Sequence, residues 1–216
     1  MAESLDQKRE RVKKIIRLFK KHIPNPECAL EHKNAEELLI ATILSAQCTD
    51  ARVNIVTKTL FKKYPSMKAF AAAKLPELEQ DIRSTGFYKN KAKSIKACAT
   101  DIVQKYGGKV PPVLEQLVEL AGVGRKTANV VLGNAFHIAS GVVVDTHVTR
   151  LSFRLGLSKA KTAEKIEQDL IELVPKEHWV NFAHWLILHG RQTCMARKPI
   201  CGDCFLSDLC PKLGVK

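Results

Sequence analysis

The sequence predicts an all-α protein. Apolar residues recur three or four positions apart through most of the 216 residues, which is the spacing of helices that bury one face. Alternation with period two is absent apart from the short run 142–144. Glycines and prolines fall between the periodic segments, where one helix can end and the next begin. Short loops are therefore expected to join the helices.

The first third of the chain predicts a basic outer helix and a buried inner one. Residues 5–23 place apolar side chains on one face and Lys or Arg on the other, whereas residues 35–45 are apolar nearly all round. Asp50 is placed to cap a helix over residues 51–63. Gln47 is then left at the junction between two helices.

Prolines divide the next segment into short helices over residues 67–73 and 76–84. The turn 86–90 that follows contains two aromatic residues, Phe87 and Tyr88. An aromatic ring in such a turn either packs beneath the loop or stands exposed for binding. A helix ending at the glycines that follow residue 106 comes next.

Two further helices flank the glycine turn 122–124 and predict a helix-hairpin-helix. The first is expected to start at Pro111 and Pro112, and the second carries apolar residues from Ala128 onward. The two glycines let the backbone turn without a Cβ penalty, so that successive N–H groups can face an anion such as phosphate. The alternative is an ordinary tight connection between helices.

Lys126 lies in the first turn of the second hairpin helix. The partial positive charge at a helix N-terminus, with Arg125 and Lys109 as contributors, disfavours the ammonium form and leaves more of the free amine. A free amine is a nucleophile. The alternative is a solvated surface lysine.

Asp145 follows the extended link 142–144 at the N-cap position of another helix. Capping alone explains an aspartate there. A capped carboxylate also stays ionised and fixed in direction, so capping and catalysis are compatible. Ser158 is expected to cap a helix that runs to about residue 174, and residues 179–190 predict the last apolar helix.

The composition favours a polyanionic partner. Lys and Arg number 35 against 22 Asp and Glu, which gives a net charge of +13, although a generic basic surface would have the same balance. The N-terminus lacks an apolar leader, and no apolar run approaches the roughly 20 residues of a membrane span. These features predict a cytoplasmic, nucleoid-associated protein, in which the seven cysteines are not expected to form structural disulfides.

Four of the cysteines crowd into the C-terminal tail, separated by six, two and five residues: Cys194, Cys201, Cys204 and Cys210. Four thiolates so close together can bind tetrahedral zinc or an iron–sulfur cube. Zinc sites usually have two close pairs, whereas this tail has one, which favours a [4Fe-4S] cluster. Arg197 and Lys198 make the first loop of the tail suited to phosphate contact.

Five segments in order resemble endonuclease III, a family of bifunctional DNA glycosylases. They are LSAQCTD (44–50), GFYKNKA (86–92), LAGVGRKTANVV (120–131), VDTHVTRLSFRLGL (144–157) and HGRQTCMARKPICGDCFLSDLC (189–210). The resemblance implies a helical barrel domain over residues 28–138. It also implies an iron-sulfur domain that combines 1–27 with 139–216 and carries a [4Fe-4S] cluster.

The same resemblance implies the chemistry of each site. Lys126 matches the nucleophile and Asp145 the catalytic aspartate, while Gln47 and Phe87 match the loop positions that enter the duplex. The implied partner is double-stranded DNA with damaged pyrimidines or abasic sites, bound by a monomer without membrane contact. The hairpin residues expected to contact DNA are Gly122, Val123, Gly124, Arg125 and Thr127.

Three positions depart from the family pattern: Ala121 replaces a usual proline, Phe87 a commoner leucine, and Cys48 an alanine or threonine. One rival interpretation is a monofunctional glycosylase that removes adenine, uracil or thymine from mismatches. The adenine-removing type lacks the hairpin lysine. The other rival is a non-catalytic DNA-binding module with a structural metal cluster, which needs neither Lys126 nor Asp145.

Overall fold

The computed structural model describes residues 3–215 and confirms the all-α prediction, because these residues form helices and loops without a strand. They fall into two compact units. We call Cys28–Ser140 the hairpin unit. We call the other the cysteine unit; it ends at Glu27 in its first segment and resumes at Gly141. None of the described helices is long and apolar enough to cross a bilayer.

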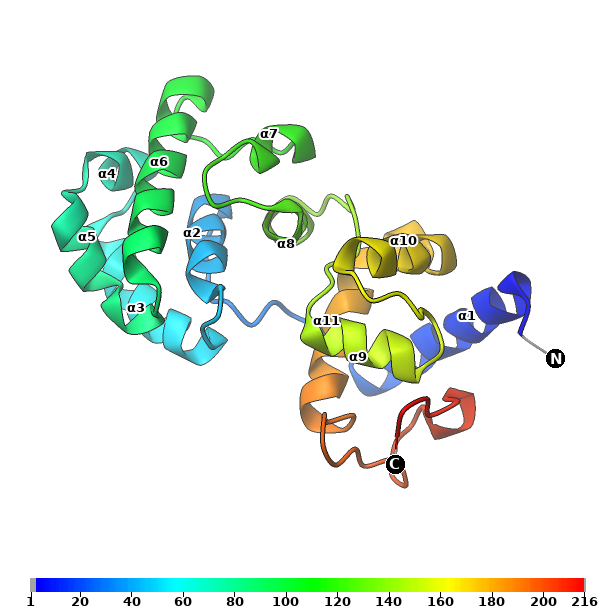
Figure 1. The fold of residues 1–216 in the computed structure, drawn as a ribbon. Coiled ribbons are helices and arrows are strands. Elements are labelled where there is room, and N and C mark those ends of the chain that lie inside the picture. Colours follow the sequence, from blue (N-terminus) through cyan, green and yellow to red (C-terminus); the bar gives the residue numbers. More distant parts are fainter. Residues whose placement is uncertain (1–2, 216) are drawn as a thin grey trace. The chain divides into compact units, whose positions relative to one another are not determined.

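The hairpin unit is built around one buried helix, α2. Its helices are α2 (Ala35–Ser45), α3 (Asp50–Lys63), α4 (Met67–Ala72), α5 (Leu75–Asp81), the 3-10 helix η1 (Arg83–Thr85), α6 (Tyr88–Tyr106), α7 (Leu114–Val118) and α8 (Arg125–Ala135). Helix α2 packs against α3, α6 and α8, and Figure 1 shows it inside this unit. Burial of a Leu or Ile side chain stabilises the fold by about 1.5–3 kcal/mol. The all-round apolar surface of α2 therefore makes it the core of the unit.

The cysteine unit joins the first helix of the chain to its last third. Its elements are α1 (Leu5–His22), α9 (Thr146–Arg154), α10 (Ala163–Leu173), η2 (Lys176–His178), α11 (Trp179–Gln192) and η3 (Ser207–Leu209). The apolar face of α1 is buried, and Phe19 stacks on Trp185 of α11 with ring centroids 5.7 Å apart. Helix α1 packs against α10, and α9 packs against α11. The basic face of α1 stays exposed, as its periodicity predicts.

Two of the predicted helix caps are wrong and one is confirmed. Thr49 rather than Asp50 caps α3, because its hydroxyl accepts from the backbone N–H of the third helical residue. Helix α10 begins after the cap Thr162, whereas Ser158 donates to Asp169 at 2.5 Å and orders the preceding loop. Asp145 caps α9: its Oδ1 accepts from Val148 N at 2.8 Å.

The predicted first residues of two helices also differ from the structure. Helix α7 begins at Leu114 rather than at the prolines, because a residue before proline is driven out of the helical region and Pro111 precedes Pro112. Helix α6 begins at Tyr88, so the turn after η1 is shorter than the predicted span 86–90.

Candidate functional site

The hairpin between α7 and α8 depends on its first glycine. Gly122 has φ 76°, and a Cβ there would lie 2.7 Å from Ser94 Cβ on α6. Gly124 has φ −86° and open space where a Cβ would stand. The prediction that both glycines spare the turn a Cβ penalty is therefore confirmed for Gly122 and wrong for Gly124, which leaves an unobstructed surface. Val123 is buried between them and holds the turn to the core.

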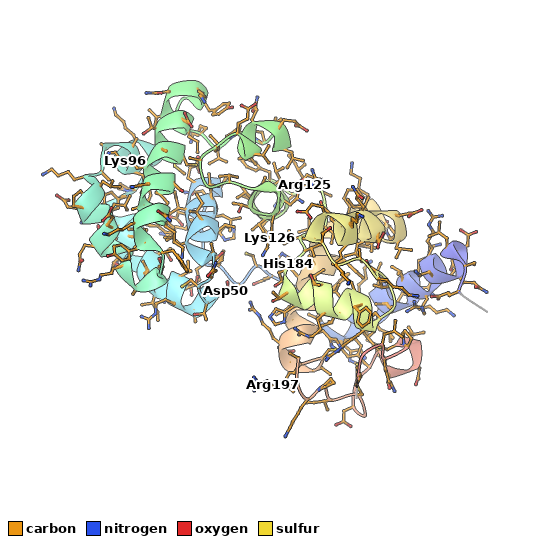
Figure 2. All side chains as sticks on the ribbon, viewed as in Figure 1. Asp50, Lys96, Arg125, Lys126, His184 and Arg197 are labelled. Carbon is orange, nitrogen blue, oxygen red and sulfur yellow. The ribbon has the colours of Figure 1, made fainter. Side chains whose placement is uncertain are left out.

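The N-terminus of α8 is left open toward solvent. In the part of the chain that the structure describes, no side chain caps this helix, whose N-cap residue is Gly124. The first backbone N–H groups of a helix have no partner within the helix, and together with the helix dipole they attract anions. Lys126 is the second residue of α8 and is exposed, next to the exposed Arg125 (Figure 2). Thr127 is half-buried in the same turn.

Gln47 and Phe87 occupy exposed loops with the same unusual backbone conformation. Gln47 has φ 53° and Phe87 has φ 48°, both in the left-handed region that non-glycine residues seldom enter. Phe87 is 62% exposed, whereas Tyr88 packs partly against the core. The interpretation that an aromatic ring packs beneath this loop therefore holds for Tyr88 and is wrong for Phe87. Strained backbone under an exposed side chain points to a functional role.

Asp145 lies in the cysteine unit, at the end of the extended link. Its Oδ1 is held by the backbone N–H of Val148, so the direction of the half-buried carboxylate is fixed. Burial lowers the pKa of the neighbouring His147, and the negative charge of Asp145 opposes that shift. Lys126 belongs to the other unit.

The four tail cysteines line one cavity in the cysteine unit. The other walls of this cavity include Leu151, Leu155 and Leu206. All four cysteines are half-buried and none forms a disulfide. Among residues 3–215, no three His, Cys, Asp or Glu side chains are grouped to hold a single ion, and the four tail cysteines line one shared cavity. This arrangement fits a multi-atom cluster.

Two further side chains, which were not predicted from the sequence, reach sulfur atoms of the cysteines. Buried Arg154 donates through Nη1 to Cys194 Sγ at 3.3 Å and to Met195 O at 2.7 Å. His189 places Nε2 3.3 Å from Cys204 Sγ, and burial lowers the pKa of His189 to about 4. Its ring is therefore neutral near pH 7. The sequence signal that could have indicated Arg154 is an arginine at a core-facing position of α9.

The charge balance of the cavity also fits an iron–sulfur group. Burial raises the pKa of Cys204 and of Cys210, so their thiolates need nearby positive charge. Cluster iron supplies that charge when bound, and hydrogen bonds to sulfur stabilise the thiolates further. The residues present therefore fit a [4Fe-4S] cluster.

The loop between Cys194 and Cys201 carries the two predicted basic residues. Arg197, labelled in Figure 2, and Lys198 are both exposed. The backbone bond from Ile200 N to Thr193 O, at 2.9 Å, closes the loop. Both side chains therefore extend into solvent from a loop that a backbone hydrogen bond closes.

The fold, the open hairpin and the four-cysteine cavity agree with a comparison to known families, which places the chain in the helix-hairpin-helix class of base-excision DNA repair proteins. The model of the HhH-GPD superfamily base excision DNA repair protein matches residues 40–176. The model of the iron-sulfur binding domain of endonuclease III matches residues 194–210. The chain belongs to the endonuclease III family.

Known proteins resemble the chain over almost its whole length. Endonuclease III of Synechocystis is 50% identical over 98% of this chain and 96% of its own. A trapped endonuclease III–DNA covalent intermediate is 44% identical with a TM-score of 0.89, over 94% of this chain and 96% of that one. A thermostable thymine-DNA glycosylase is 25% identical with a TM-score of 0.82, over 96% of this chain and 97% of that one.

The activity and the cofactor follow from this membership. The protein is a base-excision repair DNA glycosylase and AP lyase that binds DNA and carries a [4Fe-4S] cluster.

Proposed function

We propose that this protein removes oxidised pyrimidines from duplex DNA and cleaves the resulting abasic site through a Schiff base on Lys126. The position of Lys126 is the observation that carries the proposal: it is exposed in the first turn of a helix whose N-terminus is open to phosphate. An endonuclease III 44% identical to this chain has been trapped covalently on DNA, which supports the assignment.

In the proposed reaction the damaged base first leaves the duplex. Flipping a base out of the stack costs a few kcal/mol, and less when the base already pairs or stacks poorly. Gln47 and Phe87 enter the space that the base leaves, which explains why both are exposed and held in a strained conformation. Gly124 and the first N–H groups of α8 hold a phosphate near the lesion. Arg125 and Thr127 flank this phosphate.

The chemistry then needs one nucleophile and one fixed carboxylate. The neutral amine of Lys126 attacks C1′, the C1′–N bond to the base breaks, and the amine becomes a Schiff base after the sugar ring opens. Asp145 stabilises the positive charge that develops on the sugar and helps to take the proton from the amine. Loss of a C2′ proton expels the phosphate on the 3′ side, which cuts the strand.

The tail of the chain has a binding role in this proposal. The four tail cysteines hold the cluster, and the loop after Cys194 then directs Arg197 and Lys198 to the DNA backbone. We assign residues 28–138 to a helical barrel domain, and 1–27 with 139–216 to an iron-sulfur domain. The enzyme acts as a single chain on DNA in the cytoplasm.

Borohydride trapping on a duplex that contains thymine glycol tests the proposal. Wild-type protein is expected to form a covalent adduct, and Lys126→Ala is expected to form none. Lys165→Ala is the matched control, because Lys165 is an exposed lysine in the first turn of α10 and its loss is expected to leave the adduct unchanged.

The same experiment separates the rival functions. Base release without an adduct, above all from G·T, G·U or adenine mismatches, would identify a monofunctional mismatch glycosylase. Cluster-loaded protein that binds the duplex but neither releases a base nor forms an adduct would identify a binding module. Either result would refute the Schiff-base assignment.

A further inference from the structure

We propose that Lys91 is a positioning residue that holds the loop of Gln47 and the loop of Phe87 in one arrangement, so that both side chains enter DNA together. This inference rests on the proposed function, which places both side chains in the duplex. Lys91 itself touches neither DNA nor the reacting atoms in this scheme. Its role is to set the geometry of the two loops.

The hydrogen bonds of Lys91 connect the two loops directly. Lys91 lies in α6 with only 6% of its surface exposed. Its Nζ donates to Leu44 O and to Thr85 O, each at 2.8 Å. The first carbonyl lies three residues before Gln47 and the second lies two residues before Phe87. One ammonium group therefore bridges the starting points of both loops.

The bridge uses carbonyls that their own helices leave available. Leu44 is in the last turn of α2, where carbonyl oxygens have no partner within the helix and carry the negative end of the dipole. Thr85 is the last residue of η1. An ammonium can donate three hydrogen bonds, and a positive charge suits both acceptors. Replacing this group with an apolar one leaves both carbonyls without their donor.

A buried ammonium is costly, and this one has no carboxylate in its hydrogen bonds. Burial lowers the pKa of Lys91, which reflects the cost of removing the charge from water. This cost is offset if the two hydrogen bonds of Lys91 keep the loops of Gln47 and Phe87 in their strained backbone conformations. Gln47 and Phe87 both have positive φ, and strained residues persist only where their surroundings hold them.

Another lysine on the same helix shows what a purely structural clamp looks like. Lys96, labelled in Figure 2, also donates to two carbonyls, Ala71 O at 3.0 Å and Ala73 O. These carbonyls lie at the end of α4, remote in sequence from both loops. Lys96 therefore matches Lys91 in helix, chemistry and number of hydrogen bonds; it is less buried and it binds different carbonyls.

Helix α6 also supports the hairpin. Ser94 lies one turn after Lys91, and a Cβ added to Gly122 would lie 2.7 Å from Ser94 Cβ. The first half of α6 therefore contacts the hairpin and both loops within the same unit.

The test compares Lys91→Met with the control Lys96→Met in cluster-loaded, full-length protein. Single-turnover base removal is measured on a duplex containing thymine glycol, and adduct formation is measured on a single strand containing an abasic site. The single strand has no opposite strand, so the reaction on it does not require Gln47 and Phe87 to enter a duplex. Lys91→Met is expected to slow the duplex reaction roughly 10- to 100-fold, since misplacing a positioned group by about 1 Å has costs of this size. Its single-strand reaction is expected to match wild type.

Backbone amide exchange supplies a readout that does not depend on activity. Lys91→Met is expected to raise exchange at residues 45–49 and 85–88 together, whereas Lys96→Met is expected to raise it near residues 71–75. Unchanged exchange at either loop, or equal losses on duplex and single strand, would overturn the inference. Wild-type protein that neither removes the base from the duplex nor forms an adduct on the single strand would instead refute the proposed function.

Discussion

Replacing Gly122 with alanine is expected to destabilise the hairpin unit by about 1–5 kcal/mol. The new methyl group would meet Ser94 Cβ at 2.7 Å, and the backbone at φ 76° would have to hold an L side chain in the left-handed region. That conformation costs about 1–2 kcal/mol, and overpacking of a tight contact costs about 1–3 kcal/mol. Loss of glycine entropy from the unfolded chain returns about 0.4–1 kcal/mol.

A second substitution separates the two costs. Ser94→Gly removes the Cβ that the new methyl group meets, so the double variant is expected to recover the overlap part and retain the backbone part. Urea unfolding of the single and double variants gives the coupling free energy between the two positions. A positive coupling of about 1–3 kcal/mol is expected from the overlap.

Gly124 provides the control within the same turn. Its φ of −86° suits alanine and nothing lies within 4 Å of the added Cβ, so Gly124→Ala is expected to keep full stability. It is expected to weaken binding to DNA that contains an abasic site, because the methyl group stands on the surface proposed for the phosphate. The reasoning is refuted if Gly122→Ala is as stable as wild type, or if both alanine variants lose the same stability.

Three further predictions concern the cysteine unit. Arg154→Met leaves Cys194 Sγ and two carbonyls without a donor, and each unsatisfied acceptor costs about 1–3 kcal/mol. The purified variant should therefore retain less iron than wild type, and an equal iron content would contradict this. Arg197→Ala with Lys198→Ala should flatten the dependence of log K on log salt by about 0.9 for each lost phosphate contact, and an unchanged slope refutes those contacts. Burial lowers the pKa of His184 below its ordinary 6.5, so the unfolded state binds the proton more tightly and stability should fall as pH drops below 6.5. His184→Gln should weaken that fall, as followed by urea unfolding across pH, and an identical pH dependence would refute the role of this residue.

Local features of the fold were predictable from residue spacing. The apolar run 35–45 predicts the bounds of α2, and the spacing around the glycine turn predicts the hairpin. Both features depend on residues only a few positions apart, so the local sequence is enough to predict them. The wrong cap at Ser158 has the opposite origin: its hydroxyl bonds to Asp169, a partner that the prediction from nearby residues did not include.

The choice between two adjacent aromatic rings also needed the three-dimensional structure. Phe87 and Tyr88 are neighbours with similar apolar surface, and no periodicity distinguishes them in a turn. Phe87 has a positive φ and is exposed, whereas Tyr88 begins α6 and packs partly against the core. The exposure of one ring and the burial of the other are therefore settled by the folded structure.

The sequence by itself determined the helical class, the hairpin with its lysine, the capped aspartate and the four-cysteine tail, because each is a pattern of short range. Only the tertiary structure decided which side chains support these patterns from a distance. Lys91 bonds to a carbonyl 47 residues away, and Arg154 reaches a cysteine 40 residues away. Such partners are chosen by packing, which brings a buried donor to whichever acceptor the fold leaves unpaired.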